Sequence, residues 1–67
     1  MFELINDICK DHGGHTTDDS GTWMVQFPSQ KDADDVVKFV NAWGPRENWY
    51  AYHHCTIAGL IVIKCEV

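Results

Sequence analysis

Residues 29–45 read SQKDADDVVKFVNAWGP, and this stretch carries the signals for both ends of a helix. The hydroxyl of Ser29 can cap the first turn, and Asp32 follows three residues later in a short form of the capping box. Gly44 supplies a left-handed stop, and Pro45 cannot continue a helix because it has no backbone N–H. The stretch therefore predicts a helix over residues 30–43, and the flanking segments are interpreted around it.

One side of this predicted helix is apolar and the other is charged. The expected core-facing residues, with Phe39 widening the stripe, are Ala33, Val36, Val37, Val40 and Trp43. Asp32, Asp34 and Asp35 cluster at the start of the helix, where the positive end of the helix dipole stabilises each of them by about 0.3–1 kcal/mol. That local role accounts for the three acids without any catalytic function.

The segments on either side predict a second helix and three strands. Residues 2–12 have helical spacing of apolar side chains and end at Gly13 and Gly14. Residues 22–27 alternate, with Trp23, Val25 and Phe27 on one side, so they predict a strand with a buried face. Residues 15–17 are a candidate short leading strand, and residues 18–21 read as a turn.

The C-terminal third predicts a hairpin. The first strand, over residues 48–56, has Trp49, Ala51, His53 and Cys55 on one face and Tyr50, Tyr52, His54 and Thr56 on the other. Residues 57–60 form the turn. The second strand, over residues 60–67, begins with an apolar run without alternation, so both of its faces are expected to be covered.

Together these elements predict one small α+β domain over residues 1–67, in the order α-β-α-β-β. The apolar last strand is expected in the middle of a three-stranded mixed or antiparallel sheet of order 1-3-2. Both helices then pack on one face, and the helix over residues 30–43 joins the outer strands by a right-handed crossover. The outline is half of a ferredoxin-like arrangement, which by itself implies no function.

Composition narrows the function classes. The chain of 67 residues has ten acids against five lysines and arginines, a formal charge of −5. This charge disfavours direct binding to nucleic acid or to an anionic membrane and favours a partner with a basic surface. Three cysteines are an odd number, unlike the even sets of small secreted domains, and no apolar run is long enough to span a bilayer, so a cytoplasmic location is expected.

Histidines and cysteines provide an alternative. A small zinc- or redox-linked domain would use Cys9 and His12 together with His53 or Cys55, since thiolate and imidazole are the ligands that zinc prefers. The spacings do not match a standard zinc motif, and adjacent His53 and His54 point to opposite faces of a strand. Cysteines acting as buried apolar residues are therefore favoured, with no cofactor and no metal.

The aromatic residues carry the remaining signal. Two helices cover only one face of a three-stranded sheet, so rings on the other face are expected to be exposed, as in binding surfaces. We therefore expect a non-catalytic protein that binds and inhibits a larger protein or nucleoprotein partner. The expected contact residues are Asp18, Asp19, Asp32, Asp34, Asp35, Tyr50 and Tyr52.

In character, the chain resembles small acidic phage and mobile-element products that block host nucleic-acid machinery, anti-CRISPR proteins among them. If the chain is phage-encoded, the expected location is the host cytoplasm. No motif in the sequence assigns it to a particular family of such inhibitors. A structural subunit that associates with itself, for example as a homodimer through the open sheet face, is a further alternative.

Overall fold

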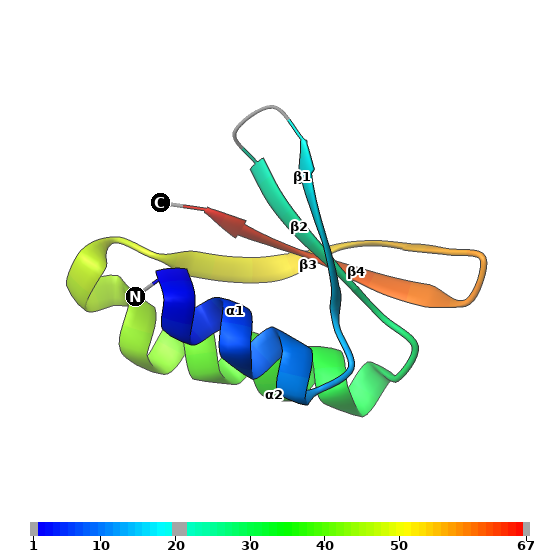
Figure 1. Cartoon of the computed structure of the whole chain (residues 1–67), viewed down its shortest axis with the longest axis horizontal. Coiled ribbons are helices and arrows are strands. Elements are labelled where there is room, and N and C mark those ends of the chain that lie inside the picture. The colour runs from blue at the N-terminus through cyan, green and yellow to red at the C-terminus, as the bar shows by residue number, and fades with distance from the viewer. Residues whose placement is uncertain (1, 20–21, 67) are drawn as a thin grey trace.

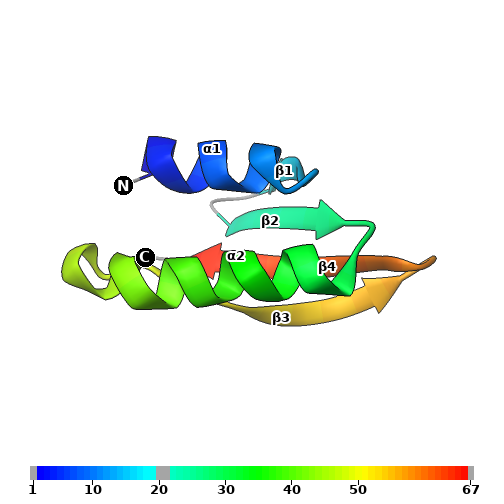
Figure 2. The same cartoon turned by 90° about the horizontal axis from the view of Figure 1, so that it is seen from below.

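The computed structural model of the protein describes residues 2–19 and 22–66. Its elements are α1 (Phe2–Asp11), β1 (His15–Asp19), β2 (Thr22–Phe27), α2 (Gln30–Trp43), the 3-10 helix η1 (Gly44–Glu47), β3 (Tyr50–Ile57) and β4 (Leu60–Glu66). Both α-helices lie on one side of a single sheet (Figure 1). From the helix side, α1 and α2 lie in front of the strands (Figure 2). The predicted α+β class is confirmed.

The sheet has four strands in the order β1-β2-β4-β3, and every neighbouring pair of described strands is antiparallel. The predicted order 1-3-2 corresponds to β2-β4-β3, so the apolar last strand is central as expected. Since β2 and β3 are both antiparallel to β4, they run in the same direction, and α2 connects them.

Strand β1 confirms the candidate strand over residues 15–17, extends it to Asp19 and corrects the predicted number of strands. It adds a fourth strand at the edge of the sheet, where it satisfies hydrogen-bonding groups of β2 that a three-stranded sheet would leave unpaired. Asp18 and Asp19 belong to β1, paired with Trp23 and Thr22, and not to the predicted turn. The remainder of that turn, Ser20 and Gly21, lies outside the described residues.

The start of α2 is as predicted, and its end is different. The Ser29 hydroxyl accepts from the Asp32 backbone N–H at 3.5 Å, and the helix covers residues 30–43. Gly44, however, does not supply the predicted left-handed stop. Its backbone has right-handed helical angles, with φ −66° and ψ −33°, and the chain continues into η1. A Cβ at Gly44 would lie 2.7 Å from the carbonyl oxygen of Trp49, so close packing explains this glycine.

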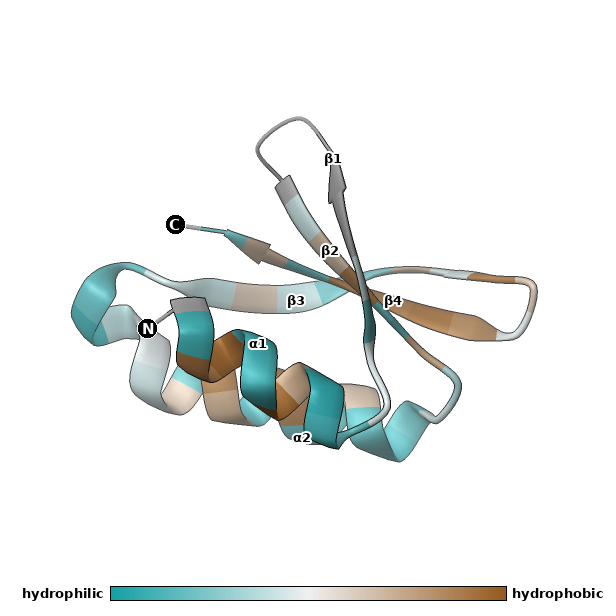
Figure 3. Ribbon diagram, in the orientation of Figure 1, coloured by the Kyte–Doolittle hydropathy of each residue, from teal (hydrophilic) through white to brown (hydrophobic). Residues whose placement is uncertain are grey.

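The core lies between the helices and the sheet. Its buried members are Ile5, Cys9, Trp23, Val25, Phe27, Ala33, Val36, Val40, Ala51, Ile61, Ile63 and Cys65. Hydrophobic residues, drawn in brown, form parts of α1 and much of β4 (Figure 3). The predicted stripe of α2 is confirmed at Ala33, Val36 and Val40, but Trp43 is 51% exposed. From Val40, the buried side of the helix continues to Gly44, and Trp49 packs there in place of Trp43.

Two further contacts join the elements of the core. Trp49 and Trp23 form an edge-to-face pair with ring centroids 6.1 Å apart. The side-chain amide of Asn41 on α2 forms two hydrogen bonds with the backbone of Ala51 on β3. Its Nδ2 donates to the Ala51 carbonyl, and its Oδ1 accepts from the Ala51 N–H, both at 2.9 Å. These two bonds hold the start of β3 against the last turns of α2.

A β-bulge changes the alternation along β3. The register pairs His53 with Ile63 but Cys55 with Val62, so the bulged strand has one extra residue. Directly paired residues of an antiparallel ladder lie on the same face. Because Ile63 belongs to the core between sheet and helices, Val62 and its partner Cys55 lie on the open face.

The predicted faces of this strand are therefore wrong beyond the bulge. Cys55 lies on the open face together with Tyr50 and Tyr52, and not with Ala51. Thr56 pairs with Ile61 and lies on the helix side. A single inserted residue in a strand inverts the faces of all residues that follow it.

Candidate interaction surface

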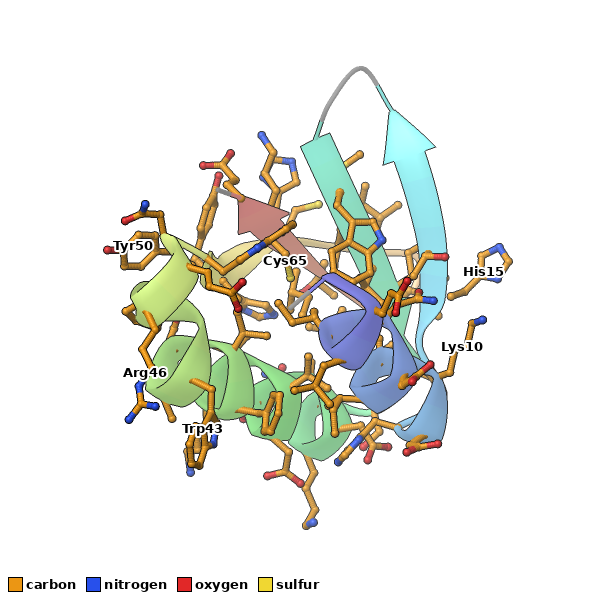
Figure 4. All side chains as sticks on the ribbon, turned by 60° about the vertical axis from the view of Figure 1, so that its left-hand side comes forward. Lys10, His15, Trp43, Arg46, Tyr50 and Cys65 are labelled. Carbon is orange, nitrogen blue, oxygen red and sulfur yellow. The ribbon has the colours of Figure 1, made fainter. Side chains whose placement is uncertain are left out.

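Exposed aromatic side chains gather at one end of the molecule. Trp43 ends α2, Arg46 lies in η1, and Tyr50 begins β3, so the chain turns through all three in eight residues. Their side chains lie along one edge of the molecule, away from Lys10 and His15 (Figure 4). Tyr52 follows on the same face of β3. We call Trp43, Arg46, Tyr50 and Tyr52 the aromatic end.

Local contacts order this end. The Arg46 guanidinium lies 5.7 Å from the centre of the Trp43 ring, within the range of a cation–π interaction. The Tyr52 hydroxyl donates to Glu66 Oε1 at 3.1 Å, and Lys64 Nζ lies 3.7 Å from the same oxygen. These contacts restrict the side chains before any partner arrives, which lowers the entropy that binding would cost.

The rings remain accessible despite these contacts. Trp43, Tyr50 and Tyr52 are 51%, 52% and 42% exposed, and no described helix covers the face of the sheet on which the two tyrosines lie. Ile57, at the far end of the same strand, is 62% exposed. Exposed apolar side chains that are neighbours on one face mark protein-binding surfaces more often than single, scattered ones do.

The acids of α2 lie elsewhere. Gln30 Nε2 donates to Asp34 Oδ1 at 2.8 Å, and Lys31 Nζ lies 3.2 Å from Asp35 Oδ2, so both carboxylates have neighbours in their own turn. Trp43 follows Asp32 by eleven positions along the helix, which corresponds to about 16 Å along the axis. The structure therefore separates the acids of α2 from the predicted tyrosines, because β3 begins beside the end of this helix. Asp18 and Asp19 pair with β2 at the end of β1.

Comparison with protein-family models, with curated proteins and with solved structures finds no match. In the described part of the chain, no helix is long and apolar enough to cross a membrane.

The cysteines do not form the ligand set that the zinc alternative requires. Cys9 lies in the core between α1 and the sheet, whereas Cys55 lies on the open face. Among the residues that the structure describes, the group of converging metal ligands contains His12 but none of Cys9, His53 and Cys55. Burial raises the pKa of Cys9 to about 12, with a smaller contribution from the nearby Cys65. Burial also raises the pKa of Cys65 to about 12.

These raised pKa values predict that stability falls in alkaline solution. Above the ordinary thiol pKa of 9.0, the unfolded chain loses the protons of Cys9 and Cys65, whereas the folded chain keeps them up to about pH 12. The folded state then holds more protons, so the free energy of unfolding decreases as pH rises from 9 to 12. We expect a decrease on the order of 1 kcal/mol per thiol at pH 10, measured by urea denaturation.

Thiol labelling of the native protein checks the same assignment. Cys55 should react first with a disulfide reagent, because it is only half-buried, and the other two thiols should react after unfolding. Equal reaction of all three thiols in the native protein would contradict the buried, protonated state of Cys9 and Cys65.

Sequence reasoning missed half of the aromatic end. Trp43 was assigned to the core because it lies three residues after Val40, the usual spacing of a buried stripe. The residue four positions after Val40 is the buried one, Gly44, and a glycine there indicates close packing against another element. Arg46 would have been found by asking which cation lies close to an exposed tryptophan in sequence.

Proposed function

We propose that the protein is a non-catalytic binding protein that attaches through its aromatic end to a basic surface of a larger protein and blocks that surface. The observation that carries this proposal is the gathering of two tyrosines, a tryptophan and an arginine at one exposed end. Tyr, Trp and Arg are the residue types enriched among the side chains that dominate binding energy at protein interfaces.

Charge supports the basic character of the partner. The two helices carry six acids against three lysines, whereas the charged residues of η1 and β4 balance one another. With a formal charge of −5 for the chain, the field around the molecule attracts a basic surface over several ångströms. In this arrangement the aromatic end makes the contact, and the acidic helices accelerate the encounter.

The proposed inhibition of the partner follows from the usual function of a basic protein surface. Clustered lysines and arginines on a protein are the usual means of holding a nucleic-acid backbone, so a protein bound there would compete with nucleic acid. An inhibitor encoded by a phage or mobile element, of the anti-CRISPR type, is the specific form of this proposal.

Capture and competition test the proposal. The wild-type chain and a variant with Tyr50→Ala and Tyr52→Ala serve as baits in a host lysate, and a protein retained only by the wild type is then purified. The proposal requires that this protein binds nucleic acid and that the wild-type chain displaces the nucleic acid. A retained protein without nucleic-acid affinity would contradict the inhibitory part. A wild-type dimer that becomes monomeric in the variant would instead show that the open face binds a second copy.

Reversal of the acids should slow association with the partner. We expect Asp7→Lys, Asp11→Lys and Asp34→Lys together to lower the association rate about tenfold or more at low salt, with little change in the dissociation rate. These three side chains are exposed, and none of them lies in the turn of α1 that is beside the aromatic end. Stopped-flow measurements at low and high salt provide the check, because the difference should vanish when salt screens the charges. A faster dissociation would place the acids in the contact itself.

A further inference from the structure

A second group of chemically active side chains lies where α1 ends and α2 begins. His12 follows the last residue of α1, Asp32 lies in the first turn of α2, and Asp35 lies one turn later. One ligand atom from each of these half-buried residues lies within 4.8 Å of the other two. Among the described residues, no other three or more His, Cys, Asp or Glu side chains converge in this way.

The imidazole of His12 is held in one orientation by the backbone. Its Nδ1 lies 3.0 Å from the carbonyl oxygen of Ile8. A carbonyl only accepts hydrogen bonds, so Nδ1 carries the proton, and the lone pair of the neutral ring is on Nε2. Histidines that bind metals almost always donate their other ring nitrogen in this way, which fixes the ring and makes it a better ligand.

The two carboxylates retain the capacity to bind a cation. Asp35 uses Oδ2 for Lys31 at 3.2 Å, which leaves Oδ1 for another partner. Asp32 lies beside it, and two neighbouring carboxylates repel each other unless a positive charge lies between them. The positive N-terminal end of α2 opposes a cation here, but the negative C-terminal end of α1 favours one from the other side.

We propose that His12, Asp32 and Asp35 bind a divalent first-row transition-metal ion, with zinc as the representative. One imidazole nitrogen and two carboxylate oxygens are a ligand set that zinc uses with water in its remaining position, whereas magnesium and calcium prefer oxygen ligands alone. Ligands about 2.1 Å from one ion lie no more than about 4.2 Å apart, so small side-chain rotations close the site.

Such an ion would join the two helices. It would tie the end of α1 to the start of α2 and so add a crosslink to a domain of 67 residues, a size at which metals commonly supply missing stability. This site shares only His12 with the ligands expected from the sequence. It does not depend on the proposed partner, since it lies at the opposite end of α2 from the aromatic end.

Titration with zinc chloride tests this inference in a Cys55→Ser background, which removes the accessible thiol. We expect calorimetry to show one ion bound per chain. At a zinc concentration 100-fold above the Kd, the Tm should rise by about 10 °C, because the ion binds only the folded chain. Magnesium should bind at least tenfold more weakly. The absence of zinc binding up to 1 mM, or equal binding of magnesium, would overturn the proposal.

Matched variants locate the site. His12→Gln and Asp35→Asn should each weaken zinc binding at least tenfold, whereas Asp34→Asn and His54→Gln should leave it unchanged. Circular dichroism establishes that each variant is folded, and if His12→Gln is not, Asp35→Asn decides the question. Zinc affinity that survives Asp35→Asn, or that is lost in His54→Gln, would refute this ligand set.

Discussion

Phe27→Ala is expected to lower the free energy of unfolding by about 3–5 kcal/mol, a large part of the stability of this chain. Phe27 ends β2 and is fully buried in the core between the sheet and the helices. Truncation of a buried phenylalanine costs about 3–5 kcal/mol, because apolar contacts are lost and a cavity remains. At about 0.05–0.15 kcal/mol per residue, a chain of 67 residues has a total stability of only about 3–10 kcal/mol. Urea denaturation followed by far-UV circular dichroism measures the loss of stability, and the dispersion of amide NMR signals shows how much of the variant stays folded.

Ile57→Ala is the matched control for this substitution. It also removes a large apolar side chain from a strand, but Ile57 is 62% exposed, so the expected cost is within about 1 kcal/mol. A Phe27→Ala protein that unfolds at the same urea concentration as Ile57→Ala would contradict the proposed packing of the core around β2.

The double variant Tyr50→Ala and Tyr52→Ala should weaken partner binding at least 100-fold. Truncating a central aromatic residue of an interface typically costs about 2 kcal/mol or more, and two such residues are removed. Both side chains are exposed, so the fold should survive, with the loss of only the hydrogen bond from Tyr52 to Glu66. Calorimetry with the purified partner gives the change in Kd.

Two further variants determine whether the rings or the hydroxyls of the tyrosines bind the partner, and which end of β3 makes the contact. Tyr50→Phe and Tyr52→Phe together keep both rings and should retain binding within about tenfold of the wild type. Ile57→Ala lies at the opposite end of β3 and should have little effect. If binding survives the loss of both tyrosines but fails in Ile57→Ala, the contact lies at the β3–β4 turn instead of the aromatic end.

Features encoded within one segment could be predicted from the sequence. The N-terminal boundary of α2 was predicted because Ser29 and Asp32 lie within one turn, and the structure confirms their hydrogen bond. The central position of β4 was predicted because an apolar run needs cover on both faces. Each of these depends on neighbours in the chain or on the simple requirement that apolar side chains be buried.

Features that depend on a distant partner could not be predicted in the same way. The residues of β1, HTTDD, have no apolar alternation, so the sequence indicated only a short strand over residues 15–17. The strand continues to Asp19 because β2 offers a free edge with which Asp18 and Asp19 pair. The bulge in β3 is visible only against the register of β4. His12 and the acids of α2 are twenty or more residues apart, and only the packing of α1 beside α2 brings them together.

The two hydrogen bonds from Asn41 to Ala51 also bear on aggregation. β3 is an outer strand, and the free N–H and C=O groups of such a strand are a template on which strands of other molecules can grow into fibrils. At Ala51 these groups are already occupied by the Asn41 amide, so an incoming strand would have to displace it. Because Asn41 belongs to α2, this protection exists only after the helix has docked. Partly folded chains are therefore expected to aggregate more readily than the native protein.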